Sequence, residues 1–212
     1  MHRVPELLDI YDDAGRRLGV KARPDVHRDG DWHRTFHLWI CGRDARGEFV
    51  ILQRRGDDRE FFPGLLDVAV AGHLAAGEDV SHGVREAEEE LCLDIAFTAL
   101  HRLGERLEVY RADGVVNRER EHVYLVRDDR PVAGYAYNAR EVDGVCRVPI
   151  NHALGLFAGS RTEVTGDLYT HERGVEPLAI RRADFVLPQS PYWPAVLAAA
   201  QRHLRGEPDV AL

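Results

Sequence analysis

The chain has 212 residues, and 44% of them are hydrophobic, which suffices for one globular domain with a sizeable core. Its formal net charge is −8 and no long run of Lys or Arg occurs, which argues against an electrostatic nucleic-acid footprint. No stretch approaches the roughly 18 apolar residues of a membrane span, and the N-terminus lacks an apolar signal core. We therefore expect a cytoplasmic protein without nucleic-acid or membrane partners, whose cysteines are reduced.

The first part of the chain predicts a hairpin followed by extended segments. Residues 1–25 contain two short strands, at 7–11 and 17–20, on either side of a turn. Over residues 26–41 the pattern predicts a polar loop, which bears His27 and His33, leading into a strand. Further extended segments are predicted at residues 49–55 and 61–73. The last segment ends in Ala71-Gly72-His73 and delivers the chain to a glycine-containing loop.

An amphipathic helix is predicted to follow, beginning near Asp79 or Ser81, because both residue types cap helix N-termini. Apolar residues recur at helical spacing on one face: Val80, Val84, Ala87 and Leu91. Glu86, Glu89 and Glu90 share another face, where like charges destabilise an isolated helix by a few tenths of a kcal/mol per pair. A hard divalent cation, which prefers oxygen ligands, would offset that cost. A solvated acidic face is the simpler interpretation when such glutamates lack other context.

The second half predicts further strands and two helices. Strand and turn are expected at 94–98 and 100–110, and a strand at 117–126 places Glu119 and Glu121 on one face. Residues 128–140 are predicted to be a loop, 141–149 a last strand and 151–157 a short helix. Residues 159–173 are predicted to be an irregular surface excursion, and residues 188–206 a closing helix. One α/β domain over residues 1–212 accounts for these elements.

Residues 72–93 resemble the Nudix box, a loop-helix-loop that binds metal and pyrophosphate. The box begins with a Gly, and a Glu follows after five intervening residues. After seven more residues comes the run Arg-Glu-aliphatic-x-Glu-Glu-x-Gly-aliphatic. Gly72 and Glu78 have this separation, and Arg85 begins a match to the second half. The chain departs from the box twice: six residues separate Glu78 from Arg85, and Cys92 replaces the glycine that favours a left-handed helix end. The resemblance extends in order over residues 35–95.

The resemblance implies a Nudix-type α/β/α sandwich with a mixed sheet. It implies a hydrolase that cleaves a pyrophosphate bond in a nucleoside diphosphate linked to another moiety, with Mg2+ or Mn2+ as cofactor. The metal ligands that it implies are Glu86, Glu89 and Glu90, one of which acts as base. It also implies that Arg85 orients a glutamate and that Gly72 lets the backbone come close to the ions. A non-catalytic nucleotide-binding Nudix module is an alternative, against which the intact triad argues. Because Nudix hydrolases are often dimers, a homodimer is also considered.

Three other residues near these elements are candidates for substrate or metal contacts. Arg54 and Arg55 end a strand and are predicted to bind phosphate as bidentate donors, with solvated charges as the alternative. Glu141 stands where Nudix enzymes use a late-loop carboxylate as an extra ligand or base. The sequence does not name the substrate, because fold alone does not.

A second set of residues resembles the metal site of isopentenyl-diphosphate isomerase, which also has the Nudix fold. The set follows the isomerase order of three histidines and two glutamates: His27, His33, His73, Glu119 and Glu121. Singly, each histidine is more often a hydrogen-bonded loop or strand residue, and His37 is interpreted as a bystander. The isomerase has a catalytic cysteine directly before its Gly-His pair, where this chain has Ala71. We therefore favour the hydrolase and keep an isomerase-like enzyme as the alternative.

Overall fold

The computed structural model describes residues 5–59, 61–112 and 115–212. Its strands are β1 (Leu7–Tyr11), β2 (Arg17–Ala22), β3 (Trp32–Asp44), β4 (Gly47–Arg55), β5 (Leu66–Val68), β6 (Val70–His73), β7 (His101–Ala112), β8 (Val115–Arg127), β9 (Val142–Pro149), β10 (Val164–Thr170) and β11 (Gly174–Ile180). Its α-helices are α1 (Arg23–Asp29), α2 (Val84–Leu91), α3 (Ile150–Phe157) and α4 (Tyr192–Leu204). Among these described residues, no helix is long and apolar enough to cross a membrane.

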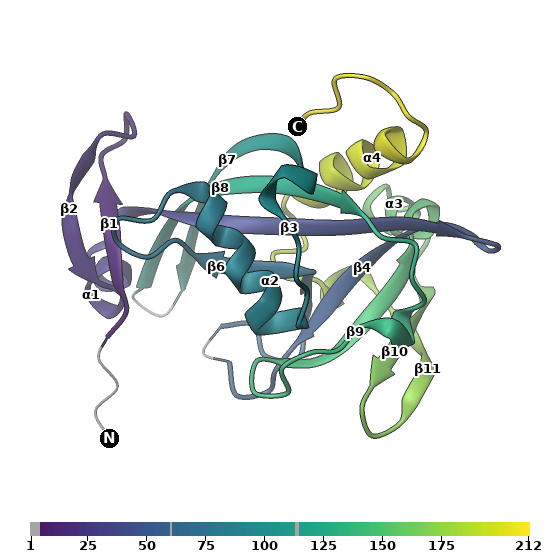
Figure 1. The fold of residues 1–212 in the computed structure, drawn as a ribbon. Coiled ribbons are helices and arrows are strands. Elements are labelled where there is room, and N and C mark those ends of the chain that lie inside the picture. The colour runs from purple at the N-terminus through teal and green to yellow at the C-terminus, as the bar shows by residue number, and fades with distance from the viewer. Residues whose placement is uncertain (1–4, 60, 113–114) are drawn as a thin grey trace.

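One mixed sheet organises the chain, and β3 runs through its centre (Figure 1). The main strand order is β11-β10-β9-β4-β3-β1-β2, while β8 pairs in parallel with β3 and antiparallel with β7. Short strands β5 and β6 pair with β4 and β3. Residues far apart in the chain, such as His33 and Glu119, are thereby cross-strand neighbours.

Helices cover both faces of the sheet, which confirms the α/β/α sandwich. Alternate residues of β3 enter different cores, because side chains of a strand point to opposite faces. Leu38 and Ile40 pack in the core that contains Ala87 and Leu91 of α2. On the other face, Trp39 packs with the residues of α3 and α4.

The N-terminal hairpin is present as β1 and β2, but the prediction of a polar loop that begins at Val26 and bears His27 and His33 is wrong. Residues 23–29 instead form α1, which has Pro24 in its first turn. Gly30 ends the helix in the left-handed conformation, with φ 71°. Pro near the start and Gly past the end of a helix is a common pairing. The side chain of His27, on this short helix, is buried in the interior.

Two other segments differ from the prediction. The irregular excursion over residues 159–173 contains β10, which forms a hairpin with β11, so β9 is not the last strand. Along β10, buried and more exposed residues alternate, with polar side chains on the outer face, and this alternation is the signature of a half-buried strand. The strand predicted over 94–98 does not form, and a 3-10 turn at Phe97–Ala99 leads into β7 instead.

The helix of the Nudix-like segment is α2, and the residues at its two ends show how it is capped. Asp79 caps a 3-10 turn, Val80–Gly83, by accepting a hydrogen bond from Ser81 N at 2.8 Å, and α2 follows directly. At the other end, Cys92 adopts a left-handed conformation, with φ 51°. The backbone N–H of Cys92 donates to the carbonyl oxygen of Glu88. Cys92 therefore ends the helix in the left-handed conformation that glycine would adopt more easily, at a conformational cost of about 1 kcal/mol.

Candidate active site

A cavity of about 610 Å³ lies where one end of the sheet meets α2 and the start of α4. Its carboxylates outnumber its arginines, and they come from segments spread along the chain. The polar side chains that line it include His27, His37, His73, Arg55, Arg59, Asp67, Arg85, Glu86, Glu89, Glu90, Arg106, Glu108, Glu119, Glu121 and Glu141. The cavity therefore brings together the glutamates of α2 and most of the second set of residues singled out from the sequence, while His33 is fully buried behind it.

Two of the three glutamates predicted to bind metal are buried, whereas the sequence places all three on an exposed face of α2. Glu86 lies directly over the backbone of β6, where a Cβ on Gly72 would stand 2.1 Å from Glu86 Cδ. Glu90 Oε2 accepts hydrogen bonds from Gln53 Nε2 at 3.0 Å and from Ala71 N at 3.1 Å. Glu89 is exposed. The absence of a side chain at Gly72 is therefore what lets α2 press its carboxylates against the sheet.

Arg85 holds the outer carboxylates in place. Its Nη1 lies 3.0 Å from both Glu86 Oε1 and Glu89 Oε1. Its Nη2 lies 3.4 Å from Glu78 Oε2, so Glu78 remains connected to the helix in spite of the shortened spacing. This arrangement agrees with the orienting role that the resemblance implies for Arg85.

The two buried carboxyl groups bind protons more tightly than exposed glutamates do. Burial raises the pKa of Glu86 to about 7 and that of Glu90 to about 8. The ionised forms are disfavoured because desolvation penalises charge and because other carboxylates lie nearby. A bound cation would reverse this preference, so the helix carboxylates have the donor chemistry of a hard-metal site.

We expect the melting temperature of the metal-free protein to fall as pH rises from about 6.5 to about 8. In this window Glu86 and Glu90 still bind protons in the folded protein. In the unfolded chain, where the pKa of a glutamate is 4.5, the same groups have already released them. Stability therefore falls as pH rises through the folded pKa values. Thermal scans in chelator test this, and Glu90→Gln should reduce the slope. An unchanged slope in that variant would contradict the assignment.

Three histidines form a separate group beside the same cavity, which His27 and His73 line. Their rings are 5.1 to 5.6 Å apart between centroids, and one nitrogen from each of His27, His33 and His73 lies within 4.8 Å of the others. Nε2 of His33 and Nε2 of His73 are buried and have no hydrogen-bond partner among the described residues. Burial lowers the pKa of His33 to about 4 and that of His73 well below its usual value. Neutral imidazoles with available nitrogens are suitable metal ligands.

Strand register brings the glutamates of β8 to these histidines. Glu119 is the cross-strand partner of His33, and Glu121 is the partner of Thr35, which in turn faces His73 on β6. Glu119 Oε1 lies 3.9 Å from His33 Nε2. The predicted pairing of Glu119 and Glu121 on one face is therefore present, and it reaches the histidine group.

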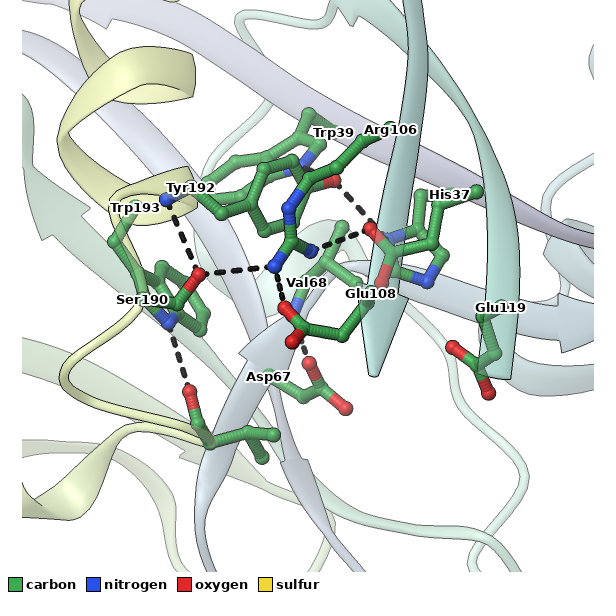
Figure 2. A network of polar contacts seen from close by, with 12 residues as sticks. His37, Trp39, Asp67, Val68, Arg106, Glu108, Glu119, Ser190, Tyr192 and Trp193 are labelled. Atoms are coloured by element: carbon green, nitrogen blue, oxygen red, sulfur yellow. Dashed lines mark hydrogen bonds and ion pairs between the residues drawn. The ribbon is translucent and has the colours of Figure 1, made fainter. Parts of the chain in front are cut away.

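The five-residue set predicted from the sequence divides into two groups. Glu121 belongs to a second group, in which its Oε2 lies 3.7 Å from Nδ1 of His37, and Glu119 completes that group. His37, interpreted from the sequence as a bystander, therefore lies in a group of three residues whose ligand atoms could hold a metal ion (Figure 2). The side chain of His37 points to the same face as His33 because the two residues stand four positions apart on β3.

Only one of the two consecutive arginines reaches the cavity. Arg55 lines it and pairs with Asp67 at 2.7 Å, whereas Arg54 is not among the residues that line it. The register between β4 and β9 shifts between Arg54 and Arg55, so the two arginines do not hold equivalent places in the sheet. Sequence reasoning missed Arg59, which lines the cavity and lies 3.1 Å from Glu141. The side chain of Glu141 is 34% exposed and thus remains accessible.

The residues present fit divalent cations at two places. The buried carboxylates of α2 offer oxygen ligands beside an open backbone at Gly72. The histidine group offers imidazole nitrogens that lack partners at His33 and His73. Oxygen ligands suit Mg2+ and Mn2+, while imidazole suits later transition metals as well.

Comparisons with known proteins agree with this geometry. A family model described as a NUDIX domain matches residues 31–167. An uncharacterized Nudix hydrolase of Clostridium acetobutylicum is 32% identical over 199 residues, which cover 92% of this chain and 96% of the relative. An isopentenyl-diphosphate Delta-isomerase of Halorhodospira halophila is 34% identical over 125 residues, which cover 56% of this chain and 66% of that protein.

A solved structure supports the fold independently. A crystal structure of a protein from Deinococcus radiodurans has a TM-score of 0.54 and 23% identity, and the match covers 74% of this chain and 91% of that one. The family model spans more than half of the chain, and the clostridial relative matches along nearly its whole length. This chain therefore belongs to the Nudix family and is a hydrolase of pyrophosphate bonds that depends on divalent metal ions.

Proposed function

We propose that this Nudix hydrolase acts, as a single domain over residues 1–212, on a nucleoside diphosphate linked to another moiety. Glu86, Glu89 and Glu90 are the proposed ligands for Mg2+ or Mn2+. The observation that carries the proposal is the seating of Glu86 against Gly72 beside buried Glu90, at the wall of a cavity of about 610 Å³. A divalent ion held there supplies charge neutralisation for the phosphoryl oxygens and a bound water of lowered pKa.

The protein side chains then divide the work. Gln53 and the Ala71 N–H orient Glu90 by donating to one of its oxygens, which leaves the other oxygen for an ion or for a proton. Glu90 is also the proposed general base, which accepts a proton from water on that second oxygen. Arg55 and Arg59 are the proposed phosphate contacts, because both line the cavity and guanidinium groups bind phosphate bidentately. Glu141, held by Arg59, is the proposed additional ligand or base.

We also propose a second metal centre at His27, His33, His73 and Glu119. The unpartnered Nε2 atoms of His33 and His73 and the approach of Glu119 to His33 support it. This centre lies next to the first in the chain, because His73 directly follows Gly72. A diphosphate in the cavity therefore has two candidate places at which its charge is neutralised.

An isomerase-like reaction is the second candidate, favoured by relatives that are named isopentenyl-diphosphate Delta-isomerase and by the histidine group. Moving a double bond requires one group that gives a proton and another that takes one. Ala71 offers neither, and none of the described residues that line the cavity is a cysteine. Hydrolysis needs no such pair, so it remains the better supported function.

A hydrolysis screen that separates the products by chromatography tests the proposal, because cleavage of a linked nucleoside diphosphate yields a nucleoside monophosphate and the phosphate of the other moiety. The substrates are nucleoside diphosphate sugars, nucleoside di- and triphosphates, dinucleoside polyphosphates and isopentenyl diphosphate, each with Mg2+, Mn2+ or chelator. We expect cleavage of linked nucleoside diphosphates that requires metal. Isomerised isopentenyl diphosphate without phosphate release would instead establish the second candidate.

A further inference from the structure

The N-terminal hairpin lies against the loop of residues 74–78, here called the box loop, which leads from β6 toward α2. Leu8 of β1 forms an isolated antiparallel bridge with Ala75 of this loop. The backbone N–H of Ala76 donates to the carbonyl oxygen of Leu7 at 2.8 Å. Because β1 precedes the residues that the family model matches, an element outside the matched residues contacts the loop before the proposed metal ligands.

The carboxylate of Asp9, on β1, extends this contact to Gly77. Its Oδ2 accepts a hydrogen bond from Gly77 N at 2.9 Å, and its Oδ1 accepts one from Arg17 Nε at 2.7 Å. The side chain of Asp9 is only 7% exposed. Burying a carboxylate is costly unless it is paired and hydrogen-bonded, and these two donors meet that need. Hydrogen bonds to an ionised acceptor are stronger than neutral ones, so Asp9 ties Gly77 to the hairpin.

Packing does not hold Gly77 in this place. Gly77 is exposed, and a Cβ added to it would meet no atom of the described residues within 4 Å. Its backbone N–H is nevertheless directed at a buried carboxylate. The position of Gly77 therefore depends on the hydrogen bond to Asp9 and on the backbone of the box loop itself.

Glu78, the next residue, connects the box loop to α2. Its Oε2 accepts a hydrogen bond from Ala75 N at 2.8 Å and lies 3.4 Å from Nη2 of Arg85. Arg85 in turn contacts the outer carboxylates of α2 through its other terminal nitrogen. A continuous series of polar contacts therefore runs from β1 to the proposed metal ligands.

We propose that Asp9 is a positioning residue for the metal site of α2. By fixing Gly77 it sets the place of Glu78, and Glu78 sets the guanidinium of Arg85 against the ligands. The inference rests on the metal site proposed above on α2. Ligands that are already in place lose less conformational freedom when an ion binds, so they bind it more tightly. Residues that hold the ligands from behind commonly change metal affinity by about 10- to 100-fold.

Titration with Mn2+, followed by the electron paramagnetic resonance signal of free Mn2+, tests the proposal because it measures binding without catalysis. The binding that Glu86→Gln removes is assigned to the site on α2. We expect Asp9→Ala to weaken this binding about tenfold. If Asp9→Ala does not fold, Asp9→Asn replaces it: it keeps the shape, loses the charge and should weaken binding at least about threefold. Native affinity in the variant used would overturn the proposal.

A double-mutant cycle tests the route through Glu78. Glu78→Ala should itself weaken Mn2+ binding about tenfold, because Nη2 of Arg85 loses its carboxylate partner. Adding Asp9→Ala to this variant should weaken binding by less than about a further twofold, since the effects of residues in one network are not additive. Losses that multiply in full would show that Asp9 does not act through Glu78 and would refute the role proposed for it.

Ile10→Ala is the matched control. Ile10 follows Asp9 on β1, and its buried side chain packs with Leu8 and Val26, on the face opposite to Asp9. The truncation should lower the melting temperature and leave the Mn2+ affinity within about twofold of the native value. If Ile10→Ala and Asp9→Ala weakened Mn2+ binding equally, any loosening of the hairpin would suffice, and a specific role of Asp9 would be excluded.

The failure of the underlying metal site gives a different result. Hydrogen exchange of the box loop in the metal-free protein reports the bond to Asp9 independently of any ion, and Asp9→Ala should accelerate it. If Glu86→Gln leaves Mn2+ binding unchanged, the proposed site on α2 is absent, and the role of Asp9 falls with it. If Glu86→Gln abolishes binding while Asp9→Ala accelerates exchange and keeps the native affinity, the site stands and only positioning by Asp9 is wrong.

Discussion

Replacing Glu90 with glutamine should lower kcat by about 10³-fold, because it removes both a metal charge and the proposed proton acceptor. The fold should survive. Glutamine has nearly the same shape, and its amide oxygen can still accept the bonds from Gln53 and Ala71 N. Because Glu90 is buried with a raised pKa, a neutral amide should leave the melting temperature of the metal-free protein at neutral pH equal or higher.

Steady-state kinetics with the substrate found in the screen, together with thermal scans, measure both effects. Glu88→Gln is the matched control, because Glu88 lies on the same helix and is exposed. That control should retain the native turnover number. Native turnover in Glu90→Gln would remove Glu90 from the catalytic machinery, whereas loss of folding would leave Glu86→Gln as the variant that decides.

Replacing Gly72 with alanine should lower kcat/KM by about 10²-fold, because a misplacement of about 1 Å in a catalytic group costs that much. The new Cβ would lie 2.1 Å from Glu86 Cδ and 2.3 Å from Glu86 Oε2. These atoms end a flexible side chain, so Glu86 will move aside while the backbone stays. We expect weaker Mn2+ binding, measured by calorimetry, with a small change in melting temperature.

Gly19→Ala is the control for this change. Gly19 also lies in a strand, and an added Cβ there would meet nothing within 4 Å. Kinetics and Mn2+ affinity should therefore equal those of the native chain. If Gly72→Ala bound Mn2+ normally but melted well below the control, the close approach of Glu86 would be a packing contact and not part of the metal site.

Local patterns in the sequence predicted the parts of the site that lie within one element. The spacing of Glu86, Glu89 and Glu90 sets their shared helix face, and the interval between Glu119 and Glu121 sets their shared strand face. Burial was not predictable from these spacings. Whether a helix glutamate is exposed depends on what packs over it, and only the approach of α2 to Gly72 buries Glu86 and Glu90.

The rest of the site depends on register between distant strands. Nothing near Arg106 in the sequence indicates that it faces Glu121, because their pairing is set by the β7–β8 hairpin. Tyr192 reaches His37 across 155 positions of the chain, so no spacing rule connects them. The error at α1 has a different origin, because there the sequence carried the signal, a Pro and Gly pair.

The wide spread of the cavity lining along the chain has a consequence for folding during synthesis. The lining begins at Pro5 and ends at Trp193, and β3 pairs in parallel with β8 across about 85 intervening positions. Long-range pairings of this kind form slowly, and domains fold as the ribosome releases them. A nascent chain that ends before residue 186 contains every residue of the Nudix box but lacks the wall that supports Arg106. The part of the cavity wall that Ser190 and Tyr192 provide is therefore completed last in the life of the growing polypeptide.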